Sequence, residues 1–160
     1  MKSLVQHIKE EFKFRINRDS AKYAYNYFPK TWSKLKQIIQ DHYAAGMYDL
    51  NDIDVSQIKD FSDLFFKDEN TGNPKFDVSR WDVSNGINFR LMFYNCEKFN
   101  SDLSQWNVSN GEYFSGMFEG CTNFNSDLSN WNVSKGIKFV GMFKNCPIKQ
   151  EFKPKHENIE

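Results

Sequence analysis

The sequence lacks any apolar run that approaches the about 18 residues a membrane-spanning helix needs. Its first residues, Met1 to Lys13, carry charges at Lys2 and Lys9 and have no unbroken apolar stretch of export-signal length. It also lacks net charge, because 21 basic residues balance 21 acidic ones. A neutral chain has no overall field that favours nucleic acid or an anionic membrane. We therefore expect a soluble, cytoplasmic protein that recognises its partner through local surface.

Groups that could perform chemistry are also scarce. The three histidines, His7, His42 and His156, are far apart in sequence, and no Ser or Cys has an evident base partner. No glycine loop of the phosphate-binding type occurs. The cysteines are odd in number, which fits a reducing compartment. We expect no enzyme activity, no cofactor and no resident metal.

The chain does have an internal repeat. Aligning it on Trp81, Trp106 and Trp131 superposes three segments, and these tryptophans are 25 residues apart. A degenerate copy precedes them in IDVSQIKDFSDLFF, with extra length in a loop at Lys67 to Lys75. Because sixteen residues are Phe, the core of these about four copies must be built largely from aromatic rings.

The pattern within one repeat predicts a strand followed by a short helix. Asp-Leu-Ser-x-Trp-Asn-Val-Ser alternates in the manner of a strand. Phe114, Met117, Phe118 and Cys121 then fall at i, i+3, i+4 and i+7, which is one face of a helix. No single copy can bury its own apolar face, so neighbours must stack. We predict an α+β fold, a short right-handed leucine-rich-repeat-like solenoid of about four coils over residues 50–152.

Both ends of such a stack need cover. Residues 1–49 form the predicted helical cap, with one amphipathic helix over 1–12 and a second that begins after Pro29 and stops at Gly46. A polar tail occupies residues 153–160. At that end, either Ile148 and Phe152 fold back over the last coil, or two chains meet end to end as a symmetric dimer.

The run MFxxCxxFNxDLSxWNVSN resembles the BspA-like leucine-rich repeats of bacterial surface proteins and mycoplasma lipoproteins. That family usually has Val where this chain has Gly86, Gly111 and Gly136, and Met where it has Phe three residues later. The resemblance implies a role in protein interaction. The N-terminal segment MKSLVQHIKEEFKFRINRDS is similar to the opening of small repeat proteins of Bacteroidetes and their phages, which implies binding and inhibition of a host defence protein in the bacterial cytoplasm.

Three columns of repeated residues could bind a ligand or could simply be structural. The cysteine column, Cys96, Cys121 and Cys146, could hold a metal, but a buried small hydrophobe explains it better. The column Asp77, Asp102 and Asp127 could bind calcium, but each Asp more readily caps its own turn. The tryptophans are identical in placement, which favours packing over an exposed aromatic ladder.

We expect a non-catalytic protein-binding module, either a monomer or an end-to-end homodimer. Its contact residues should lie where the repeats differ from one another, in three columns: Arg80, Gln105 and Asn130; Asn88, Tyr113 and Lys138; and Tyr94, Glu119 and Lys144. The alternative is a nucleic-acid-binding protein that uses the basic C-terminal coil and tail, with Lys135, Lys138, Lys144, Lys149, Lys153 and Lys155.

Overall fold

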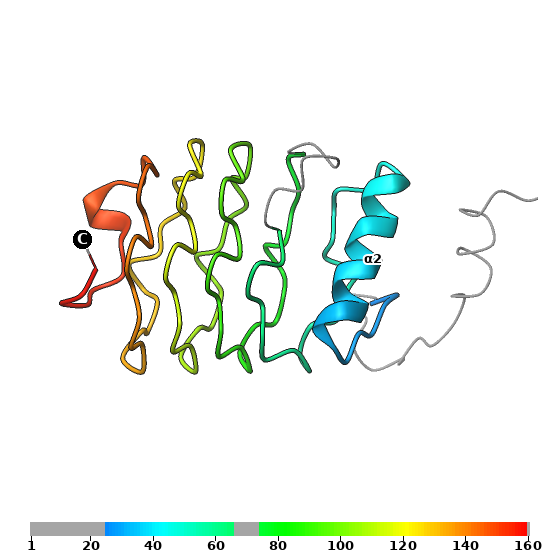
Figure 1. Cartoon of the computed structure of the whole chain (residues 1–160), viewed down its shortest axis with the longest axis horizontal. Helices are drawn as coiled ribbons and strands as arrows, with labels where there is room; N and C mark the ends of the chain where they lie inside the picture. Colours follow the sequence, from blue (N-terminus) through cyan, green and yellow to red (C-terminus); the bar gives the residue numbers. More distant parts are fainter. Residues whose placement is uncertain (1–24, 66–73, 160) are drawn as a thin grey trace, which may run out of the picture.

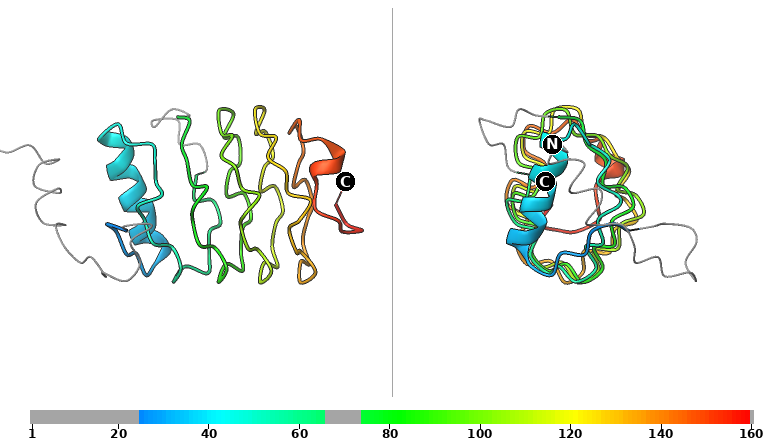
Figure 2. Two further views of the ribbon diagram at one scale, coloured as in Figure 1. Left: turned by 180° about the vertical axis from the view of Figure 1, so that it is seen from behind. Right: turned by 90° about the vertical axis from the view of Figure 1, so that its right-hand side faces the viewer.

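The computed structural model describes residues 25–65 and 74–159. They form a row of stacked loops, with a helix at one end and a folded tail at the other (Figure 1). Seen along the row, the loops nearly superimpose (Figure 2). The α-helix α2 spans Trp32–Ala44 and the 3-10 helix η1 spans Gln150–Phe152. Strand pairing among the described residues is confined to isolated parallel bridges.

The expected α+β solenoid, with a strand and a short helix in each of about four coils, is wrong. Over the described residues, no strand is longer than a single bridge and no repeat contains a helix. The segment from Phe114 to Cys121 fails as a helix because Gly116 and Gly120 have φ values of 62° and 75°. This left-handed conformation interrupts an α-helix. The segment is instead a run of turns, in which the Met117 N–H donates to the Phe114 carbonyl at 3.1 Å.

Hydrogen bonds between repeats replace the missing helix and strand. They connect four equivalent segments, 59–65, 87–95, 112–120 and 137–145, which we call the ladder face. Along this face, the N–H of every second residue donates to a carbonyl of the next repeat. Phe114 donates to Lys138 at 2.8 Å, Gly116 to Val140 at 3.0 Å, Phe118 to Met142 at 2.9 Å and Gly120 to Lys144 at 2.9 Å. The same pattern connects the earlier repeats, for example from Phe89 to Tyr113 at 2.8 Å.

Columns of phenylalanine rings form the core, as the composition predicts. One column contains Phe61, Phe89, Phe114 and Phe139, with neighbouring ring centroids 5.4, 5.5 and 5.4 Å apart. A second contains Phe65, Phe93, Phe118 and Phe143, with each spacing 5.5 Å. Rings stacked in this offset manner gain attraction beyond the area they bury. The core is therefore a set of aromatic stacks that run along the row of loops.

The glycine just before each of the last three ladder segments makes room for the phenylalanine three residues later. A Cβ added to Gly111 would lie 2.3 Å from the Phe114 ring, and the clashes at Gly86 and Gly136 are 2.3 and 2.1 Å. The ring thus occupies the space that a valine side chain would need. Glycine at this position and phenylalanine three residues later are therefore coupled in packing.

Helix α2 covers the first loop, as the sequence predicts. Thr31 caps it, because its Oγ1 accepts a hydrogen bond from the Lys34 N–H at 3.3 Å. Leu35, Ile38 and Ile39 are buried against the stack. The predicted helix over residues 1–12 lies outside the described residues.

The tail folds back over the last loop, which confirms that alternative for Ile148 and Phe152. Ile148 is buried and Phe152 is half-buried against the core. In the earlier repeats, the N–H groups of Val78 and Leu103 donate to a serine hydroxyl of the next repeat. Leu128 has no following repeat, and its N–H donates to the Phe152 carbonyl at 2.8 Å instead.

The coupled Gly and Phe positions can be tested with a double-mutant cycle. Gly111→Val alone should lower the free energy of unfolding by about 2 kcal/mol or more, because the valine overlaps the Phe114 ring. Adding Phe114→Met frees that space. In urea unfolding, the double mutant should be more stable than the sum of the single changes predicts, by about 1 kcal/mol. Strictly additive effects would contradict the coupling.

Candidate protein-binding surface

Two of the three predicted contact columns share the ladder face. Asn88, Tyr113 and Lys138 are joined to one another by parallel bridges, so they lie side by side in consecutive loops. Tyr113 and Lys138 are exposed, and Asn88 is half-buried. The column of Tyr94, Glu119 and Lys144 lies six residues further along the same segments. The ladder face therefore presents both columns together.

An ion pair fixes part of the column of Tyr94, Glu119 and Lys144. Lys144 Nζ lies 2.9 Å from Glu119 Oε1, across neighbouring loops. The hydrogen bond to Glu119, aided by the charge of that carboxylate, raises the pKa of Lys144. Lys144 itself remains exposed to solvent, so the pair adds little stability but sets the side-chain positions.

The first column lies on a different part of each loop. Arg80, Gln105 and Asn130 are all exposed and each directly precedes a buried tryptophan. The backbone N–H of Arg80 donates to the Asn51 side-chain oxygen at 2.8 Å. The structure therefore separates this column from the two that share the ladder face.

Sequence reasoning missed two exposed apolar residues on the last segment of the ladder face. Val140 is 82% exposed and Ile137 is 57% exposed. The position of Val140 is occupied by Arg90 and Ser115 in the preceding repeats. This difference between repeats is the signal that could have identified it, by the same reasoning that selected the three predicted columns.

The tryptophan, cysteine and aspartate columns are structural. The indole N–H groups of Trp81, Trp106 and Trp131 each donate to a carbonyl of the preceding repeat, at 2.8, 3.1 and 2.9 Å, and the rings are buried. This confirms the packing interpretation. Cys96 and Cys121 are buried, with each Sγ directed at a backbone carbonyl. Cys146 is half-buried.

Each aspartate of its column caps its own turn, as expected. The carboxylate of Asp77 accepts the Ser79 N–H at 2.9 Å, and Asp102 accepts the Ser104 N–H at 2.9 Å. The hydroxyl of Ser101 also donates to Asp77 and thus lies between two stacked repeats. Over residues 25–65 and 74–159, no group of three or more His, Cys, Asp or Glu residues is placed to hold a metal ion.

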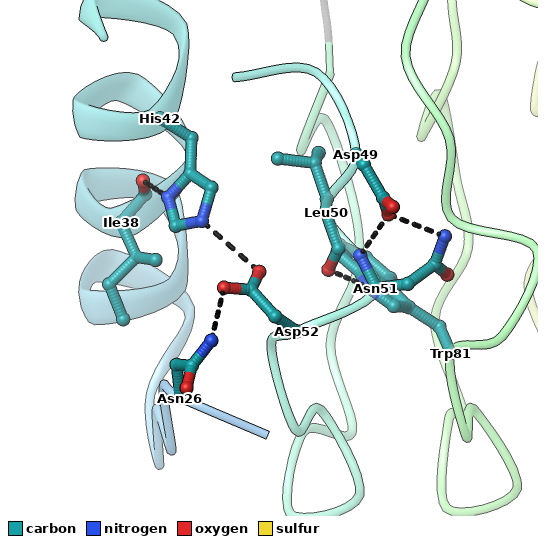
Figure 3. Close-up of polar contacts among 8 residues, drawn as sticks. All are labelled: Asn26, Ile38, His42, Asp49, Leu50, Asn51, Asp52 and Trp81. Carbon is teal, nitrogen blue, oxygen red and sulfur yellow. Dashed lines mark hydrogen bonds and ion pairs between the residues drawn. The ribbon is translucent and has the colours of Figure 1, made fainter. Parts of the chain in front are cut away.

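A buried histidine connects α2 to the first loop, and Figure 3 shows its contacts. His42 is 2% exposed, and its Nδ1–H donates to the Ile38 carbonyl at 2.8 Å. Its Nε2 lies 3.2 Å from Asp52 Oδ1, and the other Asp52 oxygen accepts a hydrogen bond from Asn26 at 3.0 Å. Both ring nitrogens face acceptors, so this geometry favours the doubly protonated imidazolium.

The pKa values of this pair shift in opposite directions. Burial opposes the charged form of His42, but the hydrogen bonds to Asp52 and Ile38 outweigh it and raise the pKa of His42. Burial also disfavours the Asp52 carboxylate, yet the hydrogen bonds from His42 and Asn26 outweigh it and lower the pKa of Asp52. The pair is thus an ionic contact between the cap and the stack.

Comparison with known proteins gives one match. A family model described as "Mycoplasma protein of unknown function, DUF285" matches residues 33–156. The chain belongs to this family. The match begins within α2 and ends in the tail, so it includes the stack and the described elements that cover its two ends. No curated protein and no solved structure matches the chain. No helix in the described part of the chain is long and apolar enough to cross a membrane.

The buried thiols should resist modification. Burial raises the pKa of Cys96 to about 12 and also raises the pKa of Cys121, so almost no reactive thiolate forms at neutral pH. An aromatic disulfide reagent at pH 7.5 should label Cys96 and Cys121 only after denaturant is added. Cys146, which is half-buried, is the internal comparison. Rapid labelling of all three without denaturant would contradict the inward placement.

The His42–Asp52 pair predicts how stability depends on pH. The raised pKa of His42 gives stability that is fully present below its unfolded value and is lost as pH rises through the folded value. The lowered pKa of Asp52 gives stability that is lost only in acid. Thermal melting should therefore show stability that declines as the pH rises above about 6.5, the ordinary pKa of histidine. In Asp52→Asn, His42 keeps only the Ile38 hydrogen bond and the charge of Asp41 against burial, so this decline should shrink or disappear.

Proposed function

We propose that this protein is a non-catalytic module that binds another protein through its ladder face. The observation that supports the proposal is the alignment of two variable columns on one surface of a repeating backbone. Asn88, Tyr113 and Lys138 differ in chemistry, yet their main chains are held in register by bridges. The residues buried beneath them recur in each repeat. The scaffold is thus constant and the surface varies.

The backbone of the scaffold makes this surface suitable for recognition. Neighbouring loops satisfy one another's N–H and C=O groups along the ladder face. Side chains such as Tyr113 are therefore presented from fixed positions, which reduces the entropy lost on binding. Tyrosine is also among the residues that contribute most to protein interfaces. A narrower proposal, inhibition of a host defence protein, rests on the resemblance to phage-encoded repeat proteins.

Site-specific crosslinking tests the proposed surface. A photoreactive phenylalanine analogue placed at position 113 should crosslink a protein partner in lysate of the source cells, whereas the same analogue at position 105 should not. Tyr113→Ala combined with Lys138→Ala should reduce capture of that partner about tenfold or more. The matched control, Gln105→Ala with Asn130→Ala, alters exposed residues of the first column and should leave capture unchanged.

Two outcomes would contradict the proposal. Capture that depends on Gln105 and Asn130 but not on Tyr113 and Lys138 would place binding outside the ladder face. Retention of RNA or DNA that falls steeply with added salt, with no protein crosslinked, would instead support the nucleic-acid-binding alternative.

A further inference from the structure

Most hydrogen bonds of the ladder face run in the same direction. At the start of each later segment the direction is reversed, because the N–H groups of Ile87, Glu112 and Ile137 donate to the preceding repeat. Beyond that point, the alternate N–H groups of each repeat point toward the C-terminal end, and the carbonyls that accept from them point back. The stack therefore has an acceptor end and a donor end. An unpaired row of either kind is a template for binding another chain.

Side chains of α2 close the acceptor end. The Trp32 indole N–H donates to the Ser62 carbonyl at 2.8 Å, and Lys36 Nζ donates to the Leu64 carbonyl at 2.5 Å. Ser62 and Leu64 are equivalent to Arg90 and Met92, whose carbonyls accept from the preceding repeat. The helix thus supplies the donors that a preceding repeat would have supplied.

The donor end has no such closure. Within residues 25–65 and 74–159, the backbone N–H groups of Phe139, Gly141, Phe143 and Asn145 have no hydrogen-bond acceptor. The tail covers the rings beside them, since the His156 and Phe139 ring centroids are 4.4 Å apart. Gly141 nevertheless remains half-buried and Asn145 exposed.

A second copy of this chain cannot pair with the open row. Every carbonyl from Lys138 to Lys144 already accepts a hydrogen bond from within the chain. From Lys138 to Lys144 the last segment therefore presents donors and no free carbonyl, so two such ends facing each other would set donor against donor along this stretch. A head-to-tail arrangement also fails, because α2 occupies the acceptor end of the next copy.

The spacing of the open donors matches a polypeptide. In the preceding repeat, the equivalent N–H groups are those of alternate residues from Phe114 to Gly120. They donate to the backbone carbonyls of alternate residues from 138 to 144. The open row therefore suits another chain that presents its carbonyls at the same interval. Val140 and Ile137, exposed on the same segment, offer apolar contacts that a phosphate backbone would not use.

The charge around the open row selects the kind of polypeptide. Five lysines of the last loop and tail are exposed or half-exposed: Lys135, Lys138, Lys149, Lys153 and Lys155. They outnumber the two exposed acidic residues of the described tail, Glu151 and Glu157. The N–H groups themselves add partial positive charge. An extended segment rich in Asp and Glu complements both features.

We infer that the C-terminal end of the ladder face binds an extended acidic segment of a partner protein, whose backbone carbonyls accept from Phe139, Gly141, Phe143 and Asn145. This inference rests on the proposed protein-binding function and specifies the chemistry of the partner. The bound segment would take the position of one further repeat.

Amide hydrogen exchange on the full chain tests whether the row is open. Gly141 should exchange at least about a hundredfold faster than its equivalent Gly116, and Asn145 faster than Gly120, because only the interior amides are hydrogen-bonded. Equal protection of the two sets without any ligand would overturn the inference, since the chain itself would then satisfy the row.

A library of displayed random peptides of about twelve residues supplies the probe. Selection on the immobilised protein should enrich acidic sequences, and a synthetic copy of an enriched peptide should slow exchange at all four open amides. Lys138→Glu with Lys155→Glu should weaken its binding about tenfold or more. Val140→Ser, which installs the residue of the preceding repeat, should weaken it severalfold. The matched control, Lys30→Glu with Lys34→Glu at the opposite end, should have no effect.

The outcomes separate this inference from the proposed function. Peptides that protect amides only around Asn88 and Tyr113 would overturn the inference and leave the ladder face as a protein-binding surface. No peptide enrichment, together with protection of the open amides by a thymidine oligonucleotide, would overturn both. An enriched peptide that is basic would also contradict the inference.

Discussion

The hydrogen bonds from each loop to the next along the ladder face are the interaction on which the rest of the structure depends. They set one repeat against another at a single spacing, and the phenylalanine rings then stack 5.4 to 5.5 Å apart in the two columns. They also require alternate N–H groups to point the same way, which the left-handed conformations of Leu91, Gly116 and Gly141 permit. Leu91 adopts it at a steric cost that glycine avoids. Backbone pairing and ring packing therefore support each other.

The shared direction of the alternate N–H groups makes the two ends of the molecule chemically different. One end offers carbonyls and the other offers N–H groups, so no single type of cap can close both. Helix α2 meets the first with an indole and an ammonium group. The tail meets part of the second end with the Phe152 carbonyl, which accepts a hydrogen bond from the Leu128 N–H outside the ladder face. The difference between the ends follows from the direction of the hydrogen bonds.

Side-chain spacing predicted much of this structure, and backbone conformation was where the prediction failed. The repeat, the aromatic core, the tryptophan packing, the turns capped by aspartate and helix α2 were all readable from residue type and interval. The run of turns that stands in place of the predicted helix was not readable, because consecutive turns can bury Phe114, Met117 and Phe118 as a helix does. Gly116 and Gly120 were the available warning, but Leu91 occupies the position of Gly116 in the preceding repeat and hides the pattern. Side-chain spacing also could not predict that two contact columns share one face, because this depends on how the backbone segments of neighbouring repeats pair.

Interior repeats each receive and give the same set of bonds, including the indole bond from each tryptophan to the repeat before it. A gene duplication that inserts one whole repeat would therefore leave both termini of the stack unchanged, while an insertion of any other length inside a paired segment would break the register. Extra length between paired segments does not break it, because Phe61 and Phe89 still stack at 5.4 Å although they are further apart in sequence than Phe89 and Phe114. Growth of the stack itself is thus restricted to whole repeats. Each added repeat would lengthen the variable surface by one row without altering the chemistry of either end.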